Sequence, residues 1–211
     1  LFLFFVIFLI IIYFLKNFKI DLDAQNYWII KTLTILEDNS INNLKYTTRP
    51  EYPHLGSFVW IFYKKFSFIK NEIFGRIFYI YIYFLSLISI SNILSKNTIQ
   101  NLFFYTLLIL LSFQESLFNG YQEVLIFSLF VFISREFYLV LNNGNKNFLK
   151  NLIIIICSCA SICWIKSEGL IFGLLFLLVL FFHFRKYKRT QAIIFFSAIL
   201  IIFSRYFYLY S

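Results

Sequence analysis

The chain has 211 residues, of which 61% are hydrophobic and only 14% are charged. Soluble domains carry about 25% charged residues, so this composition excludes a disordered chain and argues against a soluble domain. The net charge of +9 matches the excess of Lys and Arg in cytoplasmic membrane loops, and we expect no nucleic-acid partner. Because the sequence contains no methionine, we interpret it as a fragment of a longer protein.

Long apolar runs along the chain predict membrane-spanning helices, since a span needs about 20 mostly apolar residues. The predicted spans cover residues 1–15, 73–95, 101–118, 120–141, 150–165, 168–184 and 190–210. They predict an all-α fold, a polytopic transmembrane helix bundle that forms a single domain over residues 1–211. Residues 16–72 form the first outer loop of this bundle, and this loop carries surface amphipathic helices.

The first surface helix is predicted over about 22–37. Its apolar face carries Leu22, Ile29, Leu33 and Leu36. The opposite face carries Asp23, Tyr27, Lys31, Thr34 and Asp38, and we expect it to face water or substrate. Asp21 lies just before this helix. Asp23 is either the N-cap of the helix or a carboxylate that is presented to a substrate.

The second surface helix is predicted over 55–69. Only ten residues separate Pro53 from Lys64, which is too few to cross a bilayer, while apolar residues recur at helical spacing. If this helix lies in the membrane interface, the inner loops hold Lys96, Lys146 and the basic cluster at 185–189. That arrangement follows the positive-inside rule and leaves nine of the ten acidic residues outside. Those acids either are tolerated in outer loops or line a site there.

Two prolines, Pro50 and Pro53, predict a rigid and extended loop between the two surface helices. The loop displays four polar side chains, namely Arg49, Glu51, Tyr52 and His54. It either binds a charged head group or only sets the angle at which the second surface helix begins.

Two short outer turns follow, NGYQE at 119–123 and KSEG at 166–169. In the second turn, Lys166 and Glu168 either pair with each other, or Lys166 binds a phosphate as a point charge. The three cysteines, Cys157, Cys159 and Cys163, fall within one apolar stretch and lack zinc-ligand spacing.

Four segments together resemble the GT-C superfamily of polytopic membrane glycosyltransferases, which includes protein O-mannosyltransferases and lipid A aminoarabinose transferases. They are DAQNYWIIK at 23–31, RPEYPHL at 49–55, NGYQEV at 119–124 and KSEGL at 166–170. The resemblance covers residues 1–184. Three positions depart from the family pattern: Glu123 stands where Asp is usual, His54 where a second Pro is common, and Ala24 where some relatives have an acid.

The resemblance implies that a sugar moves from a polyprenyl-phosphate donor to a lipid, glycan or protein acceptor, with inversion at the anomeric carbon. It places the protein in a cell membrane, the bacterial inner membrane, with the reaction on the outer face. Membrane lipids are therefore expected partners. Asp23 is the implied general base and Asp21 supports it. The implied substrate-binding residues are Arg49, Glu51, Tyr52, His54, Glu123, Lys166 and Glu168. A divalent metal ion, if one takes part, would be held by Asp23 and Glu123.

Two other functions compete with this interpretation. A multi-pass transporter or lipid flippase would place ionisable residues at mid-bilayer or break its helices in matched halves, whereas we expect the charges of this chain at span ends. The other competing function is a catalytically inactive membrane subunit.

Overall fold

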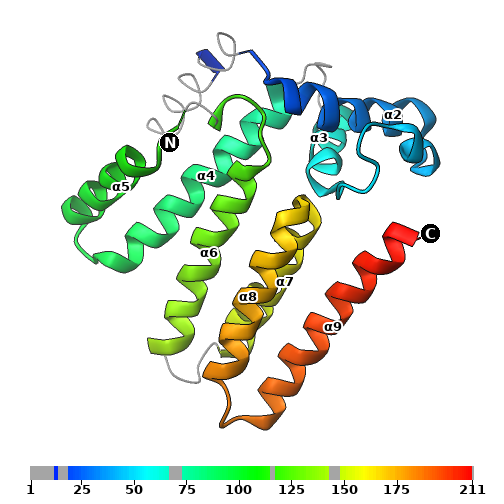
Figure 1. The fold of residues 1–211 in the computed structure, drawn as a ribbon. Coiled ribbons are helices and arrows are strands. Elements are labelled where there is room, and N and C mark those ends of the chain that lie inside the picture. Colours follow the sequence, from blue (N-terminus) through cyan, green and yellow to red (C-terminus); the bar gives the residue numbers. More distant parts are fainter. Residues whose placement is uncertain (1–11, 14–18, 67–72, 115–116, 143–147, 211) are drawn as a thin grey trace. The chain divides into compact units, whose positions relative to one another are not determined.

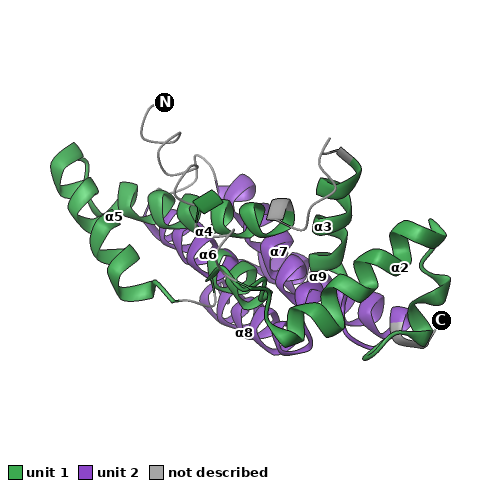
Figure 2. Ribbon diagram, turned by 90° about the horizontal axis from the view of Figure 1, so that it is seen from above, with its two compact units in different colours: residues 1–50, 54–128 green, residues 51–53, 129–211 purple. Residues whose placement is uncertain are grey.

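The computed structural model describes residues 12–13, 19–66, 73–114, 117–142 and 148–210 (Figure 1). Over these residues the chain is helical and contains no strand, which confirms the predicted all-α class. The chain divides into two compact units: residues 1–50 with 54–128, and residues 51–53 with 129–211 (Figure 2).

Four helices are long and apolar enough to cross a membrane, counted over the described residues. They cover Gly75–Leu94, Glu123–Asn142, Phe148–Ile165 and Lys188–Tyr208. Two further apolar helices, Thr98–Ser112 and Ser167–His183, are shorter. These helices are what a multi-pass membrane protein requires. The predicted span 1–15 lies outside the described residues, except for the helical pair Ile12 and Tyr13.

Most predicted spans begin and end within a few residues of helices in the structure. The observed helices are α4 (Ile73–Leu94), α5 (Thr98–Ser112), α6 (Glu123–Asn142), α7 (Phe148–Ile165), α8 (Ser167–His183) and α9 (Lys188–Tyr210). The prediction 101–118 is wrong at both ends. The Asn97 side chain accepts the Ile99 N–H at 3.0 Å and so starts α5 early, while Phe113 is extended and ends it.

The first surface helix differs most from its prediction. It is a π-helix over Ala24–Ile29 that continues as α2 (Ile30–Asp38). Its buried side chains are Ala24, Trp28, Lys31, Thr32 and Ile35. Leu22 and Leu33, which belong to the predicted apolar face, are exposed. The i→i+5 hydrogen bonds of a π-helix widen the turn, so the face that packs inward no longer follows a period of 3.6 residues.

The second surface helix, α3 (Leu55–Phe66), lies where it was predicted, and residues 67–69 of that prediction are outside the described residues. Trp60 of α3 packs on Tyr79 of α4, with ring centroids 6.0 Å apart. The Tyr79 hydroxyl donates to the Gly56 carbonyl at 3.1 Å. These contacts join the surface helix to a spanning helix within the first unit.

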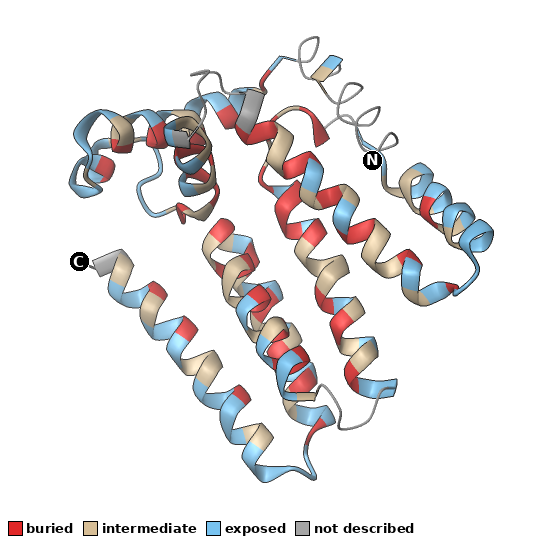
Figure 3. Ribbon diagram, turned by 180° about the vertical axis from the view of Figure 1, so that it is seen from behind, coloured by how far each residue is buried: buried red, intermediate tan, exposed pale blue. Residues whose placement is uncertain are grey.

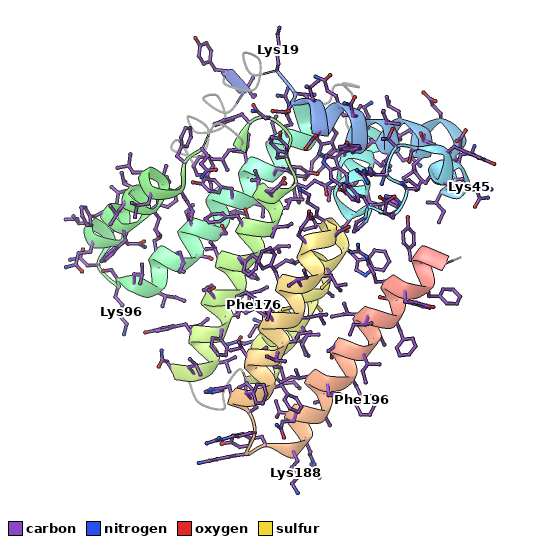
Figure 4. The ribbon with its side chains drawn as sticks, viewed as in Figure 1. Lys19, Lys45, Lys96, Phe176, Lys188 and Phe196 are labelled. Carbon is purple, nitrogen blue, oxygen red and sulfur yellow. The ribbon has the colours of Figure 1, made fainter. Side chains whose placement is uncertain are left out.

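In the second unit, α8 packs against α7 through two glycines four residues apart. Gly169 and Gly173 are both buried, and each faces the backbone of α7. This is the small-residue spacing that lets helices approach closely in membranes. By contrast, α9 buries residues only at intervals (Figure 3), and Phe196 points away from it (Figure 4).

Labelling from outside intact cells tests the predicted topology. Lys96 points out from the turn between α4 and α5 (Figure 4), and Lys186 is exposed in the turn before α9. If both turns are cytoplasmic, Lys96→Cys and Lys186→Cys should resist a membrane-impermeant thiol reagent until the cells are opened. Labelling of either variant in intact cells would contradict the topology. Cys157, an exposed native thiol, is first replaced by Ser in every variant.

Candidate functional site

The start of the first surface helix is tied to the turn at 119–123. The Asp21 N–H donates to the Asn119 carbonyl at 3.1 Å, and the Asp21 carbonyl accepts the Gln25 N–H at 2.9 Å. Gly120 has φ +85°, a conformation that favours glycine, and a Cβ there would lie 3.3 Å from that of Ala24. The glycine therefore lets the turn pack directly on the helix, and it delays the start of α6 beyond the predicted residue 120.

The hydroxyl of Tyr121 in this turn bonds to the Asp21 carboxylate and lies within electrostatic range of the Asp23 and Glu123 carboxylates. Burial raises the pKa of the Tyr121 phenol, its hydrogen bond to the Asp21 carboxylate raises it further, and so do the negative charges of Asp21, Asp23 and Glu123. Tyr121 thus stays a protonated donor. The carboxylates that act on Tyr121 come from two segments about a hundred residues apart in the sequence.

Asp21 and Asp23 differ in their surroundings. Asp21 is half-buried and accepts from Tyr121. Asp23 is exposed and holds the N-cap position of the π-helix, but its side chain makes no cap hydrogen bond and its backbone is already helical. The N-cap alternative considered for Asp23 therefore does not describe its side chain, which is left facing solvent.

Glu123 is the first residue of α6, where a negative charge is favourable next to the positive end of the helix. It also lines a pocket of about 250 Å³ between the end of α5 and the start of α6. The neighbouring Gln122 is fully buried, and its amide lies against Gly56 of α3. The turn is therefore fixed from both sides, by Asp21 and by α3.

Lys31, predicted to face water, is fully buried. Its ammonium donates to the Arg49 carbonyl at 2.6 Å and lies 5.8 Å from the centre of the Trp28 ring. Arg49 has φ +57°, so the chain before Pro50 is left-handed and not extended as predicted. The charge-assisted hydrogen bond from the ammonium stabilises the left-handed turn at Arg49. The polar-face pattern in the sequence could not reveal this bond.

Removing the Lys31 ammonium should loosen the turn that presents Arg49. Lys31→Met keeps most of the buried stem and deletes a hydrogen bond from a charged group, worth about 1.5–3 kcal/mol. We expect faster cleavage after the exposed Tyr46 than in the wild type, with chymotrypsin as the probe in detergent. Lys45→Met, an exposed lysine of the same segment, is the control. Equal cleavage rates in the two variants would contradict a role for Lys31 in this turn.

The remaining residues of the proline loop are placed differently from the prediction. His54 is buried and not displayed, because it begins α3, where its carbonyl accepts the Phe58 N–H at 2.9 Å. Arg49 and Glu51 are exposed, and Tyr52 is half-buried. Glu51 and Tyr52 belong to the second unit, whereas Arg49 and His54 belong to the first.

Lys166 and Glu168 lie at the start of α8 in the second unit. Lys166 holds the N-cap position with an extended backbone, and no side-chain cap bond forms there. Between them, the Ser167 hydroxyl accepts from Arg205 of α9 at 3.2 Å. Arg205 also donates to the Cys163 carbonyl of α7, so a residue that the sequence did not single out ties three helices at this turn.

Among the described residues, three buried charged side chains lie inside candidate spans, and each has a protein partner. Arg76 of α4 donates to the Phe118 carbonyl at 3.0 Å. Buried Glu136 of α6 accepts from Arg135, and buried Arg205 is paired as described. Pairing of this kind is what a charge needs within a membrane. Among the described residues, no group of three or more His, Cys, Asp or Glu side chains could hold a metal ion.

Comparisons with protein-family models, with curated proteins and with solved structures found no match to this chain.

Proposed function

We propose that the protein is a membrane glycosyltransferase that uses a polyprenyl-phosphate sugar as its donor. The observations that carry the proposal are the backbone bond that holds Asp21 at Asn119, the hydrogen bond between Tyr121 and Asp21, and the charges of Asp23 and Glu123 that act on the same hydroxyl. Asp23 and Glu123 come from two of the four segments that resemble the GT-C superfamily. A carboxylate that is exposed, beside another that is held by a hydrogen bond, suits general base catalysis.

In the proposed reaction, Asp23 accepts the proton of an acceptor hydroxyl or amine. The acceptor oxygen or nitrogen forms a bond to the anomeric carbon, and the bond from that carbon to the phosphate oxygen breaks. The electron pair of the broken bond leaves with the polyprenyl phosphate. A single displacement of this kind inverts the configuration of the sugar. Tyr121, kept protonated, donates to Asp21 and so holds the second carboxylate in place.

The departing phosphate requires positive charge. Among the implied substrate-binding residues, Arg49, His54 and Lys166 are the basic ones, and His54 is buried. We assign the phosphate to Arg49, which is exposed in the first unit, and to Lys166, which holds the N-cap position of α8 in the second.

Lys166→Ala should weaken donor binding much more than it lowers stability. A charge-assisted phosphate contact contributes about 1.5–3 kcal/mol, so the apparent donor affinity should fall about tenfold or more. Steady-state transfer rates at several donor concentrations measure this affinity, and Lys96→Ala, exposed in another turn, serves as the control. An unchanged affinity would leave Lys166 as a structural residue of its turn.

The donor class is tested with the full-length protein in membranes. One radiolabelled sugar is supplied either as a polyprenyl-phosphate sugar or as a nucleotide sugar, and label in acceptor material is measured. The proposal requires transfer from the lipid-linked sugar and little from the nucleotide sugar. Equal transfer from a nucleotide sugar in membranes without a polyprenyl carrier would contradict it.

A further inference from the structure

The pocket beside Glu123 combines apolar walls with a charged rim. Leu111 and Ser112 of α5, Leu117 of the following loop, and Val124 and Phe127 of α6 contribute to its wall. Leu117 and Val124 are buried, whereas Leu111 and Phe127 are exposed. The four apolar residues suit an alkyl chain, and Ser112, Gln114 and Glu123 are the polar part of the lining.

The position of the pocket along its two helices suggests where in the membrane it lies. It is formed by the last residues of apolar α5 and the first residues of α6, a candidate span. The end of a span lies at the boundary between hydrocarbon and head groups. A ligand that fits there has an apolar chain and a polar head.

The charge at the pocket selects the kind of head group. Glu123 is the charged side chain among the described lining residues, and it acts on the Tyr121 hydroxyl together with Asp21 and Asp23. A carboxylate in the pocket wall repels an anionic head such as a phosphate and attracts hydrogen-bond donors or a cation. The polyprenyl-phosphate donor is therefore a poor occupant.

We infer that this pocket binds the acceptor, and that the acceptor is a lipid whose head group carries hydroxyl or ammonium donors. The apolar chain lies against Leu117, Val124 and Phe127. The head group lies at Glu123, whose charge acts on the same Tyr121 hydroxyl as that of Asp23. The name acceptor rests on the proposed function, whereas the binding itself does not.

Photolabelling of the full-length protein in lipid nanodiscs tests this inference. Three probes share a dodecyl chain with a diazirine and differ in the head group, which is an amine, an alcohol or a carboxylate. Labelling of the peptides over 111–127 is measured by mass spectrometry relative to α9, whose exposed Phe196 and Phe203 report general contact with lipid. We expect preferential labelling of 111–127 by the amine or the alcohol, and the more efficient of the two identifies the donor group.

Glu123→Gln should lower that preferential labelling about tenfold, because a hydrogen bond to a charged group is lost. Glu37→Gln, an exposed acid on α2 of the same unit, should not change it. Equal labelling by the carboxylate probe, or unchanged labelling in Glu123→Gln, would overturn the inference. If the protein binds the amine or alcohol probe but transfers no sugar, only the proposed function is contradicted. Transfer without preferential labelling would contradict only the pocket.

Discussion

Asp23→Asn is expected to lower the rate of sugar transfer by about 10²–10⁴-fold, the usual contribution of a general base. Asparagine keeps the shape of the side chain and removes its ability to accept the proton. Asp23 is exposed and makes no side-chain cap hydrogen bond, so folding and membrane insertion should not change. Transfer rates of purified wild-type and variant protein, with thermal unfolding as a check on the fold, measure the effect.

Asp21→Asn is the matched control, since it removes a carboxylate from the same cluster. Asp21 accepts a hydrogen bond from Tyr121, and the amide oxygen of asparagine can still accept that bond. We therefore expect a much smaller loss of rate. Transfer at the wild-type rate in Asp23→Asn would show that the assignment is wrong. If Asp21→Asn were the inactive variant, the base would be Asp21.

Gly173→Leu should separate α7 from α8 and cause a large loss of stability. A Cβ at position 173 would lie 2.5 Å from Cys163 Sγ and 2.8 Å from the Cys159 carbonyl oxygen, closer than atoms can approach without movement. Overpacking costs about 1–3 kcal/mol even where side chains can shift, and here part of the obstacle is backbone. We expect a clearly lower midpoint of thermal unfolding in detergent and a lower yield of folded protein.

The control for Gly173→Leu is Val179→Leu, a substitution on an exposed part of the same helix. It adds apolar volume without a neighbour to displace, so its unfolding midpoint should stay near that of the wild type. Equal midpoints for Gly173→Leu and the wild type would mean that the close packing of α7 and α8 is not required.

The length of the apolar runs predicted the helices of this protein well, because a run of that length has few alternatives to a membrane span. The ends of the helices were less predictable, since they depend on single residues. The cap at Asn97 and the left-handed Gly120 moved two boundaries. The inward face of the first surface helix was mispredicted, because its π-helical turn changes the spacing on which the pattern relied.

The candidate site was predictable in its residue types but not in its contacts. The motifs marked Asp23 and Glu123, but no local sequence pattern connects either residue to Tyr121. That connection depends on the backbone hydrogen bond between Asp21 and Asn119. Lys31 was predicted to face solvent, but its ammonium donates to the carbonyl of a residue eighteen positions later. Arg205 is a similar case, because its partners lie on two other helices. Such pairings arise from tertiary structure, and no regular spacing of residues in the sequence indicates them.

The fate of the sugar–phosphate bond tests the central claim most directly. Proteoliposomes that contain the full-length protein and a polyprenyl-phosphate sugar, labelled in both the sugar and the phosphate, are incubated with acceptor lipid, and the products are separated. A glycosyltransferase releases unglycosylated polyprenyl phosphate in an amount equal to the sugar found on the acceptor. Movement of the intact donor between the leaflets, with both labels still on one molecule, would contradict the account and indicate a flippase.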